Sequence, residues 1–257
     1  MNKIKKPLLF FSTQYFMYIG RAVDTIVHDH HAVQIAICFE DKIEMILTDL
    51  TINEKSIIID SDVPHECRTR DNNFLLINID PECKIGKGLR KVYLTGNKTA
   101  RLPEKLVEQL LEDFIPMFLG EPNMDCIFKI TFKFLQKLSQ ADVKEELDDR
   151  IVKVLQVLNK PGNSALKVKD LAETVYLSPS RLIHLFTTEV GIPIRKYILW
   201  ARLLISLQHI LNANDITEAA LVGGFSDAPH FNRTFKRMFG LNPTLLFNNS
   251  QFIQAYV

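Results

Sequence analysis

The sequence has few cysteines and no long apolar run. Four cysteines occur in 257 residues, and Cys38, Cys67, Cys83 and Cys126 show none of the paired spacings of zinc sites or disulfide frameworks. We therefore expect free thiols in a reducing compartment. No segment approaches the ~20 apolar residues of a membrane span, and the basic start at Met1 is not followed by a signal-peptidase site. These absences predict a cytoplasmic protein of two domains with no membrane contact.

Net charge is also nearly absent, but the charges are unevenly distributed. From Arg150 onward there are 12 basic and 6 acidic residues, and the preceding part has 19 and 24, which gives +6 and −5 within a total of +1. A basic carboxyl-terminal part beside an acidic one is typical of a DNA-binding module joined to a separate sensing module.

A helix-turn-helix pattern occurs twice near the carboxyl terminus, from Val168 to Gly191 and again from Ile216 to Gly240. In the first copy, apolar residues recur with helical period on both sides of the turn. Ser178 is expected to cap the second helix, with Pro179 at its first position. Gly191 then predicts where that helix ends.

The second copy has the same organisation with different residues. Asp215 and Glu218 predict a capping box at its start, and residues 223–224, both glycine, predict the turn. Ser226 or Asp227 is expected to begin the next helix. One side of that helix is rich in phenylalanine and the other is basic, as expected for a helix that packs on a core and reads a groove.

An almost wholly apolar helix is predicted between the two copies, over residues 193–211. At a rise of about 1.5 Å per residue it spans roughly 28 Å. One turn of DNA is roughly 34 Å. The spacing therefore predicts that one polypeptide places two helices in successive major grooves of double-stranded DNA.

From Asp148 to Phe247 the residues resemble the AraC/XylS family of transcriptional regulators. LSPSRLIHLF, the break from Gly191 to Pro193, GFSDAPHFNRTFK and GLNP stand in the order and spacing of that family. Lys167 departs from it, because the family usually has a Ser or Thr cap there, so that cap is missing or replaced. The resemblance implies reading helices at 179–190 and 228–239, with these DNA-facing residues: Ser180, Ile183, His184, Thr187, Ala228, Pro229, Asn232 and Arg233.

The second reading helix is expected to discriminate bases more strongly than the first. Arg233 can bind guanine in bidentate fashion and Asn232 can bind adenine, each contributing roughly 1–3 kcal/mol of discrimination. The first helix offers a hydroxyl, an apolar contact and one imidazole. Lys236 and Arg195 are also expected to contact DNA, Arg195 without sequence preference. A contact of Arg233 to phosphate alone stays open as an alternative.

The amino-terminal part is expected to be mostly β. AVQIAICF, KIEMILTDL, SIIID and FLLINID are short runs of β-favouring residues separated by turn residues, which predicts a small barrel or sandwich. Helices follow at 104–119 and 124–140. The fold class is therefore α+β with two domains: a cupin-like β-barrel sensing domain at 1–102, a helical segment at 103–144 and an all-α double helix-turn-helix domain at 145–257.

Histidines cluster near two of the predicted strands. His28, His30 and His65 match the order of an H-x-H pair and a later histidine in cupin metal sites, whereas Gln34 replaces the usual Glu. A neutral amide is a poorer ligand than a carboxylate for a divalent ion. Three interpretations stay open: a divalent metal site, a decayed site that takes an organic effector or nothing, and histidines in a solvated loop.

The main hypothesis is a bacterial, sequence-specific transcriptional regulator that binds promoter or operator DNA and a small effector, and is not an enzyme. The resemblance also implies contact with RNA polymerase and a homodimer formed through helices 104–119 and 124–140. An alternative is a metal-dependent cupin enzyme with a fused DNA-binding module. A third class, a nucleic-acid binder with little sequence choice, differs in the ratio of specific to non-specific affinity.

Overall fold

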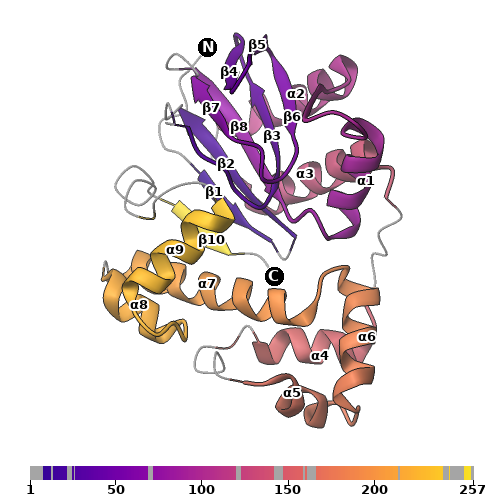
Figure 1. Cartoon of the computed structure of the whole chain (residues 1–257), viewed down its shortest axis with the longest axis vertical. Helices are drawn as coiled ribbons and strands as arrows, with labels where there is room; N and C mark the ends of the chain where they lie inside the picture. Colours follow the sequence, from indigo (N-terminus) through magenta and orange to yellow (C-terminus); the bar gives the residue numbers. More distant parts are fainter. Residues whose placement is uncertain are drawn as a thin grey trace.

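In the residues that it describes, the computed structural model (Figure 1) contains a β-rich part with three helices and a second part built from six helices. No helix among the described residues is long and apolar enough to cross a membrane. The structure describes residues 8–12, 14–21, 25, 27–68, 72–119, 123–141, 147–158, 160, 166–213, 215–239, 243 and 252–255.

The described strands form two sheets, which are not joined into one closed barrel. Neighbouring strands are antiparallel except for one parallel pair, β1 with β10. The smaller sheet has the order β5 (Leu50–Glu54), β4 (Ile43–Leu47) and β7 (His65–Arg68). The larger sheet has the order β10 (Phe252–Ala255), β1 (Leu8–Phe11), β2 (Tyr15–Arg21), β8 (Asn73–Ile79), β3 (Val33–Cys38), β6 (Ser56–Ile59) and β9 (Thr99–Arg101).

The larger sheet is the middle layer of the β-rich part. Every residue of β3 and β8 is buried, because both faces of the sheet are covered. Ile35 and Ile37 share one apolar core with the helices on that face, and Ala36 and Cys38 share another with Met45 of the smaller sheet. The first face is covered by three helices (Figure 1): α1 (Lys84–Tyr93), α2 (Glu104–Leu119) and α3 (Met124–Ser139).

The bounds of α2 and α3 agree with the prediction, whereas α1 was not predicted. Its start depends on the thiol of Cys83, whose Sγ accepts a hydrogen bond from the backbone N of Gly86 at 3.2 Å. A homodimer was expected to form through these two helices, but their apolar residues Phe114, Ile127 and Leu138 are buried in the core of their own domain. Much of the apolar surface of α2 and α3 is therefore covered by the chain's own core.

The predicted α+β architecture is confirmed, with helical helix-turn-helix units after the β-rich part. The bounds of both reading helices, α6 and α9, agree with the prediction. The helices of this second part are α4 (Asp149–Leu158), α5 (Val168–Thr174), α6 (Pro179–Val190), α7 (Ile194–Ala213), α8 (Ile216–Val222) and α9 (Ala228–Phe239).

Local capping residues determine where α6 begins and ends. The hydroxyl of Ser178 accepts a hydrogen bond from the backbone N of Arg181 at 3.3 Å, and Pro179 is the first helical residue. Gly191 ends the helix in the left-handed region, with a φ of 88°. Both ends confirm the prediction, because they depend on residues adjacent in sequence.

Two other helix starts differ in detail from the prediction. The carboxylate of Asp215 caps α8 as predicted, but Glu218, expected to complete a capping box, lies 3.3 Å from Nε2 of His209 on α7. At α5 the missing Ser or Thr cap is replaced, because the carboxylate of Asp170 accepts a hydrogen bond from the backbone N of Lys167 at 2.8 Å.

Helix α7 connects the two helix-turn-helix units and is buried on several sides. Tyr197 and Ala201 belong to the core that also contains residues of α4, α5 and α6. Leu203 and Leu207 belong to the core that contains residues of α8 and α9. Each unit therefore shares a core with a different set of α7 residues, and the two units lie toward opposite ends of this helix (Figure 1).

Gly223 gives a test of this packing, since a β-carbon there would lie 1.9 Å from Oγ of Ser206 and 2.6 Å from the backbone O of Arg202, both on α7. We expect Gly223→Ala to lower the free energy of unfolding by about 1–3 kcal/mol through overpacking. The measurement is the thermal unfolding midpoint. Gly96→Asn is the control, because Gly96 has open space around it and Asn tolerates its positive φ; equal losses would contradict the packing argument.

Candidate nucleic-acid interface and histidine cluster

The outer face of α6 carries the residues that were expected to read the first groove. Ser180, Ile183 and His184 are exposed, and Thr187 is partly buried. The hydroxyl of Thr187 donates to the backbone O of Ile183 at 2.8 Å, so it can only accept a hydrogen bond from a base. Leu182 on the inner face is fully buried. The structure therefore brings these four predicted residues to one helix surface.

The outer face of α9 is basic. Pro229, Arg233 and Lys236 are exposed, and Ala228 is partly buried. Asn232 differs from the expectation, because its side-chain Oδ1 is buried and has no hydrogen-bond partner among the described residues. To bind adenine, this amide must turn outward. Arg233 is therefore the strongest base-reading candidate of the second helix.

Asp227, and not Ser226, caps the start of α9. Its Oδ1 accepts a hydrogen bond from the backbone N of His230 at 2.6 Å, and its Oδ2 accepts one from the hydroxyl of Ser226 at 2.9 Å. These hydrogen bonds, first the one from His230, hold the pKa of Asp227 below its ordinary value. The cap fixes the first turn of α9, from which Pro229 projects.

A basic groove lies beside the first reading helix. It has a volume of about 640 Å³ and includes Pro179 and Ile183 of α6, so it opens on the surface that carries the reading residues. Among its cations, only Arg195 was predicted from the sequence to contact DNA. The missed residues come from the N-cap of α5, from α5 and from α7, and what they share is a positive charge: Lys167, Lys169 and Arg202.

Tyr176 was also missed. It lies in the turn between α5 and α6, it is 94% exposed, and its φ of 55° is unusual for a residue other than glycine. A tyrosine hydroxyl is among the groups that bind DNA phosphate. Its position beside the reading helix adds a polar aromatic contact to this surface.

The length of α7 sets the spacing of the two reading helices. Its 20 residues span about 30 Å at the rise of an α-helix. Helix α6 lies at one end of α7, and α8 and α9 lie at the other (Figure 1). This spacing is close to the roughly 34 Å that separates successive major grooves on one face of DNA.

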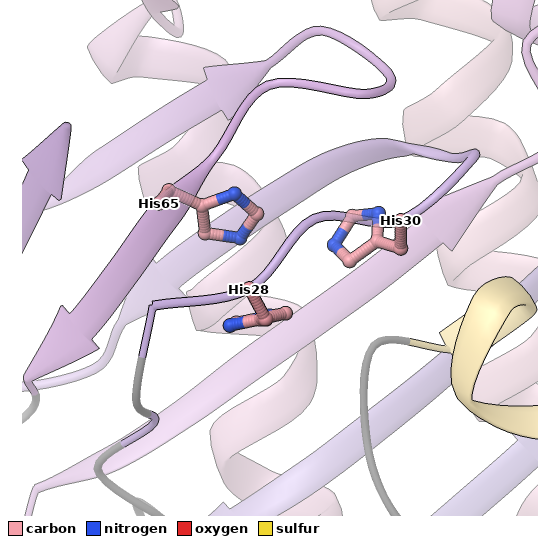
Figure 2. Close-up of side chains that lie close together, drawn as sticks. All are labelled: His28, His30 and His65. Carbon is pink, nitrogen blue, oxygen red and sulfur yellow. The ribbon is translucent and has the colours of Figure 1, made fainter. Parts of the chain in front are cut away.

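Three histidines meet on the β-rich part (Figure 2). His28 and His30 lie on the segment before β3, and His65 begins β7; one nitrogen of each lies within 4.8 Å of the others. Backbone hydrogen bonds of 3.0 and 2.9 Å between His28 and His65 hold the two segments together. His30 and His65 are buried, which excludes the solvated-loop interpretation for these two.

Hydrogen bonds orient the two buried rings. Nδ1 of His65 donates to the backbone O of Val63 at 2.8 Å, and Nε2 of His30 donates to Oε1 of Gln34 at 2.7 Å. The opposite nitrogens, Nε2 of His65 and Nδ1 of His30, are buried without a hydrogen-bond partner among the described residues. Gln34, which stands where cupin metal sites usually have a Glu, accepts this hydrogen bond from His30.

Burial also keeps both rings neutral. It lowers the pKa of His65 to about 3, and it lowers the pKa of His30 although Gln34 opposes this change. A neutral imidazole with one N–H committed to an acceptor presents its other nitrogen as a lone pair. This is the arrangement of metal-binding histidines and their supporting hydrogen bonds, so the side chains fit a transition-metal ion.

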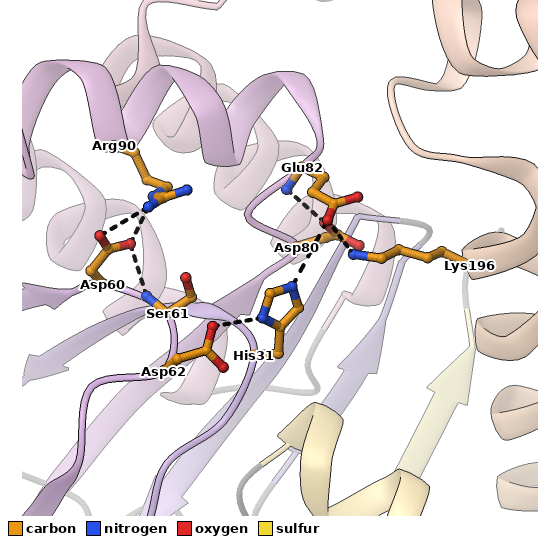
Figure 3. Close-up of polar contacts among 8 residues, drawn as sticks. All are labelled: His31, Asp60, Ser61, Asp62, Asp80, Glu82, Arg90 and Lys196. Carbon is orange, nitrogen blue, oxygen red and sulfur yellow. Dashed lines mark hydrogen bonds and ion pairs between the residues drawn. The ribbon is translucent and has the colours of Figure 1, made fainter.

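The segment that carries the cluster also contacts the helical part (Figure 3). The backbone N of His31 donates to the backbone O of Arg237 in α9 at 3.2 Å. The ring of His31 lies 2.8 Å from a carboxylate oxygen of Asp62 and 4.0 Å from one of Glu82. Glu82 forms an ion pair of 2.7 Å with Lys196 on α7, and this contact lowers the pKa of Glu82. The histidine cluster is thus one residue from a contact with α9.

Two capped helix-turn-helix units on one connecting helix, with polar outer faces, define a DNA-binding protein of the helix-turn-helix class. The family described as "Helix-turn-helix domain" matches residues 171–249. The predicted domain of the AraC type is confirmed, and the chain is a DNA-binding transcriptional regulator.

Known regulators resemble the chain over different extents. The probable transcriptional regulator LumQ of Photobacterium leiognathi is 24% identical over 228 residues, which cover 84% of this chain and 90% of LumQ. The Msm operon regulatory protein of Streptococcus mutans is 33% identical over 92 residues, which cover 35% of this chain and 33% of that protein. Unsaturated fatty acid-bound ToxT of Vibrio cholerae is 12% identical and covers 95% of this chain and 99% of its own, with a TM-score of 0.49.

Arg233 and Arg195 are expected to contribute to DNA binding in different ways. Arg233→Ala should remove roughly 1–3 kcal/mol of discrimination at one base position. Arg195→Ala should weaken binding to all sequences alike and reduce the salt dependence by about one charge. Affinities for a selected site, its single-base variants and random DNA at several salt concentrations measure both effects, and the same profile from both variants would rule out the distinction.

Proposed function

We propose that the chain regulates transcription by bipartite recognition of DNA, with α6 and α9 in successive major grooves. The observation that supports this most directly is the capped pair of helices held about 30 Å apart by α7. Arg233 supplies the strongest base contact. Ser180, Ile183 and His184 supply weaker ones, and the basic groove beside α6 binds phosphate.

We also propose that the β-rich part controls this activity through a small effector. Support comes from the direct contacts between the two parts: His31 with Arg237, Glu82 with Lys196, and a hydrogen bond of 3.1 Å from Nε2 of Gln14 to the backbone O of Val190. A change of shape near these contacts reaches both α7 and the ends of the reading helices. Binding of RNA polymerase, a homodimer and a cytoplasmic location stay expectations from the sequence.

A metal-dependent cupin enzyme with a fused DNA-binding module is the second candidate. The three-histidine cluster favours it, because three nitrogen ligands leave a coordination position for a substrate. DNA-binding variants distinguish the two functions. In a regulator, Arg233→Ala weakens control of the target promoter even though the β-rich part is unchanged, whereas an enzyme keeps its main activity in that variant.

Selection of random duplexes with the full-length protein at one physiological salt concentration tests bipartite recognition. We expect an enriched site with two half-elements about ten base pairs apart, because the reading helices are separated by about one turn of DNA. Repeating the selection with Arg233→Ala should reduce the base preference at one position of one half-element.

The affinity ratio decides between a specific regulator and a general nucleic-acid binder. The enriched site should be bound at least about 10³-fold more tightly than random DNA at the same salt. A ratio near one would contradict the proposal and favour a protein that binds nucleic acid with little sequence choice. Enrichment of a single half-element would contradict the role of one of the two helices.

A further inference from the structure

Two of the three histidines in the cluster have a buried ring nitrogen that can accept a ligand. Nδ1 of His30 and Nε2 of His65 are buried and lack a hydrogen-bond partner among the described residues. Buried polar atoms of this kind are normally paired, so an unpaired one calls for an explanation such as a bound ion. The two rings come from different segments, and one nitrogen of each lies within 4.8 Å of the other and of a nitrogen of His28.

The donor set indicates which ions fit. Three imidazoles suit zinc, copper, iron or nickel, whereas Mg²⁺ and Ca²⁺ take oxygen ligands. A tetrahedral ion about 2.0–2.1 Å from each nitrogen holds the nitrogens about 3.4 Å apart. The present separations of up to 4.8 Å are larger than this, so a bound ion draws the three histidines, and the segments that carry them, closer together. The fourth position stays available for water or an anion.

Gln34 has a defined role in this arrangement. Its Oε1 accepts the N–H at Nε2 of His30 at 2.7 Å, so this nitrogen carries the proton and Nδ1 keeps the lone pair. The backbone O of Val63 does the same for His65. Supporting acceptors of this kind orient the ligands of metal sites. Gln34, whose neutral amide is a poor metal ligand, therefore supports the histidine ligands instead.

The same segment leads to the DNA-reading part. His31 follows His30 directly, and its backbone N donates to the backbone O of Arg237 in the last turn of α9. The backbone O of His30 accepts from the backbone N of Asp62, whose carboxylate contacts the ring of His31. A displacement of His30 by a bound ion therefore acts on a residue that contacts α9.

We propose that His28, His30 and His65 bind a divalent transition-metal ion, with zinc as the best match, and that this ion is the effector that controls DNA binding. Drawing His28 and His30 toward His65 pulls the segment away from Arg237, loosens its hold on α9 and strengthens DNA binding. The effector role rests on the proposed function, whereas the metal site itself does not.

Metal binding is tested directly on full-length protein that has been treated with chelator and desalted. We expect one Zn²⁺ per chain in competition with a chromophoric chelator, and one Co²⁺ with the visible absorption of nitrogen coordination. His65→Ala and His28→Ala should each weaken binding by at least tenfold. Gln34→Leu should weaken it by about 10–100-fold.

Control variants separate loss of the site from loss of the fold. His209→Gln removes a histidine of α7 outside the cluster and should leave the affinity for Zn²⁺ unchanged. His28 is only partly buried, so His28→Ala should keep the circular dichroism spectrum even if a variant at His65 does not. Absence of stoichiometric metal binding in folded wild-type protein, or unchanged binding in folded His28→Ala, overturns the site.

The effector role is tested by fluorescence anisotropy with the duplex enriched by selection, at one salt concentration with and without Zn²⁺. We expect about tenfold tighter binding with the ion in wild type and no change in His28→Ala. Equal or weaker binding with bound Zn²⁺ overturns the effector role and leaves DNA recognition intact. Failure to enrich any duplex, with or without Zn²⁺, refutes the proposed function and the effector role. The number of Zn²⁺ ions bound per chain then still tests the metal site.

Discussion

The burial of α7 on more than one side is the constraint on which the rest of the helical part depends. One set of its apolar residues packs with α4, α5 and α6, and another packs with α8 and α9. Because both units use the same rigid helix, their separation is fixed by the number of residues in it and not by a flexible linker. The contact surface for DNA is therefore a property of packing as much as of the exposed residues.

Elements that depend on neighbouring residues could be predicted from the sequence. The bounds of α6 and α9 follow from Ser178, Gly191 and the apolar periodicity, because caps and periodicity act within a few residues. Helix α1 was missed because its cap is a cysteine thiol, a weak hydrogen-bond acceptor that no common capping pattern includes. Glu218 was misjudged because its partner, His209, belongs to a different helix.

The candidate sites could be predicted only as far as residue types. The order of the three histidines indicated a cluster, but not that Gln34 supports His30 instead of joining the ligands. The basic groove combines residues from α5, α6 and α7, and a one-dimensional charge pattern does not show which cations share a surface. Contacts such as Gln14 with Val190 join residues 176 positions apart, and no local rule anticipates them.

Strand β10 gives the chain a second connection between its two parts. It pairs in parallel with β1 over four residue positions, from Leu8 with Phe252 to Phe11 with Ala255, so the helical part is joined to the β-rich part both before α4 and after α9. A part held at two points stays at a high effective concentration beside its partner after the other contacts open. Separation of the two parts is then a hinged and readily reversed motion, which favours rapid switching over lasting release.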